Sequence, residues 1–180
     1  MTGLFAFGLA LVVIAGAVIG LSLRQRTRLR MQRLARFPFP PALARKVKAT
    51  YPQLGDSQVT AVLDGLREFF FLSAMAKGRM VAMPSQVVDV AWHEFILSTR
   101  SYQAFCQDTL GRFLHHTPAE AMTSPTQAQA GIRRAWRLAC LREGMNPRHA
   151  THLPMLFALD QLLAIPDGFR YALDCHAAQL

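Results

Sequence analysis

The chain of 180 residues is poor in cysteine and in charge. It has three cysteines, too few for the disulfide framework of a small secreted domain. Charged residues make up 17% and hydrophobic residues 52%, which excludes an intrinsically disordered chain because such chains lack the apolar groups for a core. The sequence also contains no P-loop, dinucleotide fingerprint, serine nucleophile elbow or HExxH pair. None of these common motifs therefore marks the chain as an enzyme.

Acidic residues are missing from one segment, and this determines where the formal charge of +9 lies. Residues 24–50 hold nine basic side chains and no acidic one, whereas residues 51–180 hold eleven of each sign. The excess charge therefore belongs to a short segment and not to the fold. No pattern of base-stacking aromatic residues accompanies it, so the sequence disfavours a nucleic-acid partner.

Charge is absent altogether from Gly3 to Leu23, 21 residues rich in Leu, Val, Ile, Ala and Phe. A helix of that length covers the roughly 30 Å hydrocarbon core of a bilayer. A cleaved signal peptide would begin with positive charge and have a shorter apolar run; here only two uncharged residues precede the run. We therefore expect an uncleaved transmembrane anchor. Gly16 and Gly20 form a GxxxG spacing through which two such helices could pair as a homodimer.

A run of arginines follows the apolar stretch: Arg24, Arg26, Arg28, Arg30, Arg33 and Arg36. Cytoplasmic flanks of transmembrane helices carry an excess of Lys and Arg. We expect a single-pass protein of the inner or plasma membrane, with its N-terminus outside and its C-terminal domain in the cytoplasm. The same arginines would attract anionic headgroups, at about 1 kcal/mol per basic residue near the surface. The predicted partners are the lipid bilayer and, for the domain, another protein.

The chain divides into a transmembrane anchor (residues 1–23), a basic juxtamembrane segment with a proline-rich linker (24–41) and a helical domain (42–180). The prolines between Phe37 and Pro41 should end any helix that leaves the membrane. Apolar residues at three-and-four spacing predict helices over residues 56–80, 84–110, 124 onward, 153–165 and 169–178. No stretch alternates with a period of two. The predicted fold class is all-α, a single N-terminal transmembrane helix plus a small cytosolic helical bundle.

Polar side chains are densest in and after the helix that begins at residue 84: Asp89, Trp92, His93, Tyr102, Cys106, His115 and His116. Asp89 and His93 stand four apart and share a helical face. This is metal-ligand spacing, and equally the spacing of a carboxylate that orients an imidazole by a structural hydrogen bond. His115 and His116 could close a site from the following loop. Cys106 lies far round the helix from His93 and is expected to be a core thiol. A divalent metal is thus a candidate cofactor, and none is firmly predicted.

The order Asp89-x-x-Trp92-His93, then Tyr102, Cys106, Gly111 and His115 or His116, resembles the signature of the glycine-rich domain-containing protein-like family. The resemblance covers Pro84 to Pro118. The glycine-rich tail of that family is absent, and Phe95 stands where plant members have a second histidine. The resemblance implies a helical domain with a His-centred polar signature, in a family that is largely a domain of unknown function with no settled catalytic activity.

Two functions follow from these observations. The sequence favours a membrane-anchored cytosolic domain that acts as an interaction or scaffolding module. The alternative is a metal-binding protein or metal-dependent enzyme that uses Asp89, His93 and one of the two adjacent histidines.

Overall fold

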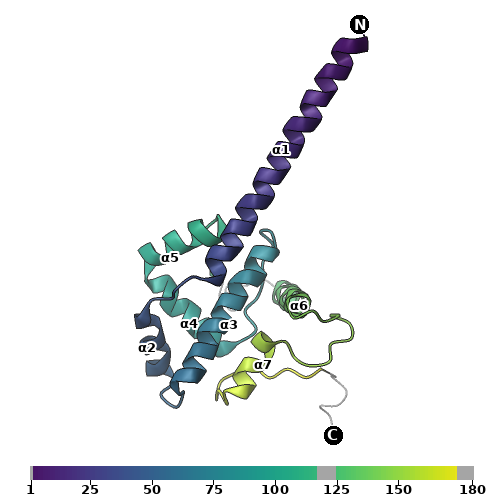
Figure 1. Cartoon of the computed structure of the whole chain (residues 1–180). Helices are drawn as coiled ribbons and strands as arrows, with labels where there is room; N and C mark the ends of the chain where they lie inside the picture. Colours follow the sequence, from purple (N-terminus) through teal and green to yellow (C-terminus); the bar gives the residue numbers. More distant parts are fainter. Residues whose placement is uncertain (1, 117–124, 174–180) are drawn as a thin grey trace.

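The computed structural model describes the backbone of residues 2–116 and 125–173, and the side chains of residues 14–116 and 126–173. Helix α1 (Thr2–Ala35) projects from the body as a long rod (Figure 1). The body consists of α2 (Pro41–Thr50), α3 (Asp56–Met75), α4 (Gln86–Leu97), α5 (Thr99–Phe105), the π-helix η1 (Cys106–Leu110), α6 (Pro125–Arg142) and α7 (Met155–Leu162). No strand occurs in these described residues, so the predicted all-α class is confirmed.

Helix α1 continues from the apolar stretch through the basic segment, because Leu, Arg, Gln, Met and Ala are good helix formers. It ends at Ala35, just before the prolines, as the sequence predicts. Its last turn packs on the body, where Leu34 is fully buried. Arg67 of α3 donates from Nη1 to the carbonyl oxygens of Leu34 (3.2 Å) and Phe37 (2.8 Å). The Leu34 carbonyl also accepts from Phe37 N (3.2 Å), so Arg67 adds a second bond there and bonds the first residues after the helix.

Among the residues whose side chains are described, which in α1 begin at Ile14, no helix is long and apolar enough to cross a membrane. The predicted span, Gly3 to Leu23, lies partly outside these residues. Its described apolar side chains are exposed, with 56% to 64% of their surface accessible: Ile14, Val18, Ile19, Leu21 and Leu23.

A cluster of phenylalanine rings forms the centre of the body. Phe37, which follows α1, lies 4.6 Å from Phe105 of α5 between ring centroids. Phe70 of α3 lies at the same distance from Phe105, and Phe39 meets Phe95 of α4 edge to face at 5.6 Å. Tilted and edge-to-face pairs at these distances are favourable beyond the area they bury. The proline-rich segment therefore joins α1 to the core shared by α3, α4 and α5.

The predicted single helix over residues 84–110 is wrong, because the chain breaks at Ser98, with φ −82° and ψ 58°. Serine and threonine side chains compete for backbone hydrogen bonds, so Ser98-Thr99 is a weak point in a helix. The predicted end near Gly111 is confirmed. Gly111 has a left-handed conformation (φ 73°), and its N–H donates to the Cys106 carbonyl (2.8 Å), as in a π-type turn.

Other helix boundaries differ from the prediction in ways that backbone conformation explains. Helix α3 ends at Met75 instead of residue 80, because Lys77 and Gly78 have positive φ values of 51° and 88°. Helix α2 was not predicted. The helix expected over residues 153–165 is the shorter α7. Of the helix expected over 169–178, residues 169–173 are not helical and the rest lie outside the described residues. Residue 124, where another helix was expected to begin, also lies outside them.

Asp160 of α7 holds the beginning of α4. Its side chain is only 1% exposed and accepts hydrogen bonds from Ser85 Oγ (2.7 Å), Gln86 N (2.7 Å) and Val87 N (3.2 Å), and also from Phe169 N (2.8 Å). A carboxylate at a helix N-terminus satisfies N–H groups that lack intrahelical partners and complements the helix dipole. Asp160 thereby fixes the helix that carries Asp89 and His93.

Candidate metal centre and adjacent cavity

Three of the four predicted metal ligands come together. Asp89, His93 and His116 each offer one ligand atom, and these atoms all lie within 4.8 Å of one another. His116 Nε2 is 3.0 Å from Asp89 Oδ1, and His93 Nε2 is 3.3 Å from His116 Nδ1. The side chain of His93 is 50% exposed and that of His116 only 13%. The cluster therefore lies at the boundary between the core and solvent.

The position of His116 depends on a chain of buried hydrogen bonds. Trp92 Nε1 donates to the Tyr102 hydroxyl (3.0 Å), which donates to the carbonyl of Leu114 (2.6 Å). The His116 ring also meets the Trp92 ring edge to face at 4.6 Å. Burial raises the pKa of Tyr102 far above its usual range, so its hydroxyl stays protonated and can donate. Tyr102 thus holds the loop in the position that places His116 beside Asp89.

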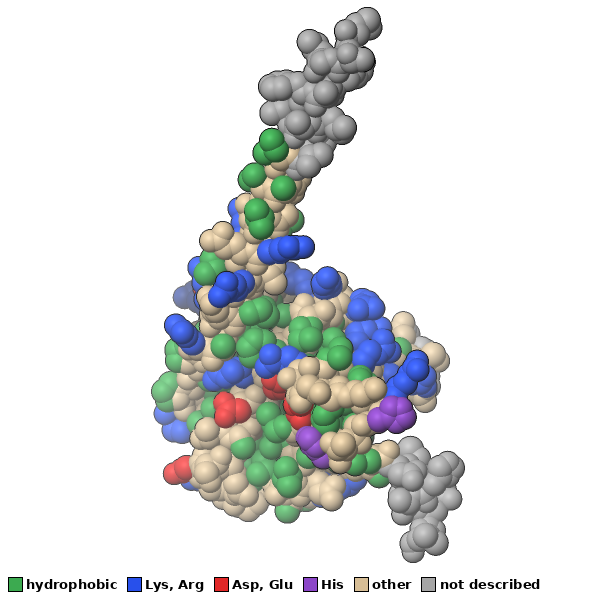
Figure 2. All heavy atoms as spheres, turned by 45° about the vertical axis from the view of Figure 1, so that its right-hand side comes forward, with side chains coloured by type: hydrophobic (Ala, Val, Ile, Leu, Met, Phe, Trp, Pro, Cys, Tyr) green, Lys and Arg blue, Asp and Glu red, His purple; other side chains and the backbone are tan. Residues whose placement is uncertain are grey.

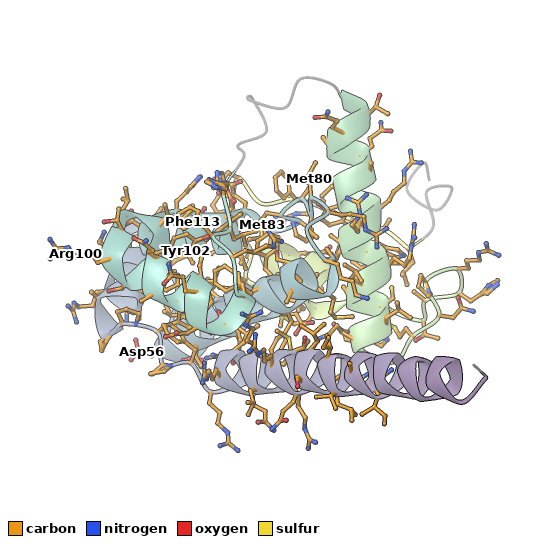
Figure 3. All side chains as sticks on the ribbon, turned by 90° about the horizontal axis from the view of Figure 1, so that it is seen from above. Asp56, Met80, Met83, Arg100, Tyr102 and Phe113 are labelled. Carbon is orange, nitrogen blue, oxygen red and sulfur yellow. The ribbon has the colours of Figure 1, made fainter. Side chains whose placement is uncertain are left out.

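His115 is not part of the cluster. It is exposed, and its ring packs on Phe113 at 4.8 Å; Phe113 in turn lies against Tyr102 at 5.3 Å (Figure 3). His149 and His152, which stand three residues apart, are also exposed. His152 Nε2 lies 3.5 Å from Glu143 Oε2. Cys175 and His176 lie outside the described residues.

Cys106 is fully buried, which confirms the expectation of a core thiol. Burial raises its pKa, and so the neutral thiol is favoured. Gly111 has a packing role. A Cβ atom at this position would overlap the guanidinium group of Arg30, so glycine allows α1 to approach the end of η1.

The six arginines after the apolar stretch differ in exposure. Arg30 is half-buried against Gly111, whereas Arg24, Arg26, Arg28, Arg33 and Arg36 are exposed. Figure 2 shows basic side chains gathered along the described part of α1 and around the point where it enters the body. Among the described residues, no side chain and no other element lies within 4 Å of a Cβ added at Gly16 or Gly20, and their pairing in a dimer stays a prediction.

A cavity of about 770 Å³ adjoins the cluster, and Asp89, His93 and His116 contribute to its lining. Its walls come from α3, α4, α6, the loop between α3 and α4, the loop after η1, and residues near Phe169. Pockets of this size accommodate small organic molecules.

Sequence reasoning missed three residues that shape this region. Asp160 is the one acidic residue among residues 153–165, which are mostly apolar, and this contrast could have indicated a buried role. Arg112 follows Gly111 directly and lines the cavity. Ser73 also lines the cavity, but it falls on the apolar face of α3, and nothing in the sequence separates it from core residues.

The described part of the chain is thus an all-α domain with a long N-terminal helix and a His/Asp cluster at the edge of a cavity. The chain belongs to the UCP032817-like family, an uncharacterised family whose model matches residues 29–180. No curated protein and no solved structure is significantly similar to it.

The resemblance to the glycine-rich domain-containing protein-like family is wrong, because the match that extends over most of the chain is to a different family. The residues behind the resemblance explain the error. Trp92 and Tyr102 share a buried hydrogen bond, Cys106 fills the core and Gly111 ends a helical turn. Many helical folds use residues in such packing roles, so a short pattern of these residues does not identify one family.

Proposed function

We propose that the protein binds one divalent transition-metal ion through Asp89, His93 and His116. The observation that carries the proposal is the proximity of one ligand atom from each side chain, all within 4.8 Å. Two imidazoles and one carboxylate form a donor set suited to zinc, iron and related metals. Bonds of about 2.0–2.2 Å to a common ion place neighbouring ligand atoms about 3.0–3.5 Å apart. Small side-chain rotations would therefore complete the site.

The donor set and its surroundings favour an open site over a closed structural one. Structural zinc sites use four protein ligands, whereas catalytic sites keep a position for water or substrate beside three protein ligands. The three residues line one cavity, so a molecule in the cavity would reach an ion held there. This supports metal-dependent chemistry on a small ligand. The interaction or scaffolding role favoured by the sequence stays a prediction, because the observations that support it are less specific than the proximity of the three ligand atoms.

Metal analysis of the full chain tests the proposal. The protein is purified in mild detergent through an affinity tag without histidines, stripped with a chelator and dialysed against zinc or cobalt. We expect one ion per chain. We expect His93→Ala, His116→Ala and Asp89→Asn each to lower the affinity by about tenfold or more. His115→Ala is the matched control, because this exposed neighbour lies outside the cluster, and it should bind like the unaltered chain.

Thermal unfolding provides a second measurement. A metal that binds only the folded chain raises its stability by about 2.7 kcal/mol at a free concentration 100 times Kd. Substoichiometric binding, or an equal loss of affinity in His115→Ala, would refute the proposed site. A melting temperature that does not change when metal is added to the stripped chain would also contradict it.

We also propose that α1 anchors the protein in the inner or plasma membrane, with the body on the cytoplasmic side. Two observations support this. Apolar side chains of α1 from Ile14 to Leu23 are exposed, which is costly in water. Exposed arginines follow at once, and positive residues flank the cytoplasmic ends of membrane helices.

Extraction of membranes at alkaline pH should leave the chain in the pellet, and a C-terminal reporter should be active only in the cytoplasm. Release of the chain into the supernatant would refute the anchor.

A further inference from the structure

The cavity beside the His/Asp cluster has many apolar side chains in its lining. The apolar lining includes Met80, Val81, Met83, Ile132 and Phe169. Met80 and Met83 lie on the loop between α3 and α4, beside α6 (Figure 3); the Met80 sulfur packs so closely on Gly131 of α6 that a Cβ there would overlap it. Methionine side chains adapt to ligands of different shape. These apolar side chains suit the apolar body of a small molecule.

One polar atom in the cavity lining lacks a partner. Ser73 is only 3% exposed, and its Oγ has no hydrogen-bond partner in the part of the chain that the structure describes. Buried hydroxyl groups are nearly always hydrogen-bonded, because an unpaired one loses its bonds to water without replacement. Ser73 lines the cavity, but its Oγ is covered in the empty protein, so a rotation of the side chain toward the cavity would let a polar group of a bound molecule supply the missing partner.

Two arginines in the cavity lining contact the backbone at the end of α3. Arg112 Nη2 is 3.5 Å from the Ser73 carbonyl oxygen, and Arg79 Nε is 3.4 Å from the Ala76 carbonyl oxygen. Within the described residues, neither guanidinium forms an ion pair with a carboxylate. A planar guanidinium matches a carboxylate through two parallel hydrogen bonds. The same pair of arginines would repel a cationic ligand.

We propose that this cavity binds a small organic acid, with its carboxylate at Arg112 and Ser73 Oγ and its apolar body against the methionine-lined wall. The proposal goes beyond metal binding and does not depend on it, since Arg112 and Ser73 are not metal ligands. If both proposals hold, the bound acid lies beside the ion, because one cavity contains both groups.

Calorimetric titration of the full chain in lipid nanodiscs tests the proposal, with empty nanodiscs as the blank. The probes are phenylbutyrate, its neutral amide and the corresponding amine, all measured in the presence of a chelator. We expect the acid to bind at least about tenfold more tightly than the amide, because it forms charge-assisted hydrogen bonds. The amine should bind more weakly still. Equal affinity for acid and amide, or no binding of the acid, would overturn the proposal.

Two variants and one control connect the binding to the named residues. Arg112→Gln should weaken binding of the acid by about tenfold or more. Arg100→Gln, which removes an exposed arginine of α5 outside the cavity, should have no effect. Ser73→Ala should weaken binding while leaving the melting temperature of the empty protein unchanged or higher, since it removes a buried hydroxyl group without a partner. Unaltered affinity in both cavity variants would overturn the assignment.

The chelator separates this proposal from the metal proposal. Loss of acid binding in Arg112→Gln without metal would support the cavity proposal even if the chain binds no ion. Stoichiometric metal binding with no affinity for the acid would overturn the cavity proposal and leave the metal proposal standing.

Discussion

Replacement of Asp160 by Asn should destabilise the body strongly. The carboxylate accepts four hydrogen bonds at distances of 2.7–3.2 Å and is 1% exposed. Each carboxylate oxygen accepts two of these bonds. The amide keeps one acceptor oxygen and turns an NH₂ group toward two donors, so about half of the bonds are lost. A hydrogen bond to a charged group contributes about 1.5–3 kcal/mol, and an unsatisfied buried donor costs about 1–3 kcal/mol. We expect a loss of about 3–5 kcal/mol in the free energy of unfolding.

Urea unfolding followed by tryptophan fluorescence measures this loss in the full chain. Both tryptophans, Trp92 and Trp136, lie in the body, so the signal does not report on α1. For a chain of this size the expected loss lowers the melting temperature by roughly 6–20 °C. Asp64→Asn is the matched control, because that side chain is 59% exposed and lies 3.8 Å from Arg67. Surface pairs contribute at most about 1 kcal/mol. A loss below about 1 kcal/mol in Asp160→Asn would refute the capping role.

Three further predictions concern the tyrosines and the glycines of positive φ. Tyr102→Phe removes the donor to Leu114 and the acceptor for Trp92. We expect urea unfolding to show a loss of about 1–3 kcal/mol in stability, and equilibrium dialysis to show a metal affinity about tenfold lower. Unaltered metal affinity would contradict the positioning of His116 by this loop. Gly111→Ala should lower stability more than Gly144→Ala. Both glycines have φ 73°, but within the described residues an added Cβ would overlap another side chain, that of Arg30, only at Gly111; equal losses would refute this packing role. Burial raises the pKa of all three tyrosines, to about 12 for Tyr51 (with Asp167 adding to the effect) and for Tyr171. Their contribution to stability is therefore complete below pH about 10 and is lost as pH rises toward 12. Ultraviolet titration should find little phenolate at pH 11 in the folded chain and nearly full ionisation in urea, and a tyrosine that ionises near 10 in the folded chain would contradict this.

Local spacing predicted the part of the site that lies within one helix. Asp89 and His93 share a face of α4 because they stand four apart, and their pairing needed no knowledge of the tertiary structure. The choice between His115 and His116 could not be made in this way. It depends on the Trp92–Tyr102–Leu114 hydrogen bonds, which join residues from α4, α5 and the following loop.

Apolar periodicity likewise predicted α3, α6 and α7 but not every break between elements. The interruption at Ser98 is a local conflict between side-chain and backbone hydrogen bonding, too weak in sequence to outweigh the apolar pattern on both sides. Helix α2 is short and has a proline on either side, and its pattern resembles a loop until Leu43 and Val47 are seen buried in the core. The cavity was beyond prediction, because its walls come from segments distant in sequence.

The contacts between α1 and the body fix the orientation of the body relative to α1. Leu34 and Phe37 enter the core, Arg67 bonds their carbonyl groups, and Arg30 lies against Gly111. A helix held at this many points cannot swivel freely as it would on a glycine-rich tether. Any surface that holds α1 therefore also sets the direction in which the cavity opens, so that molecules approach the cavity from a restricted range of angles.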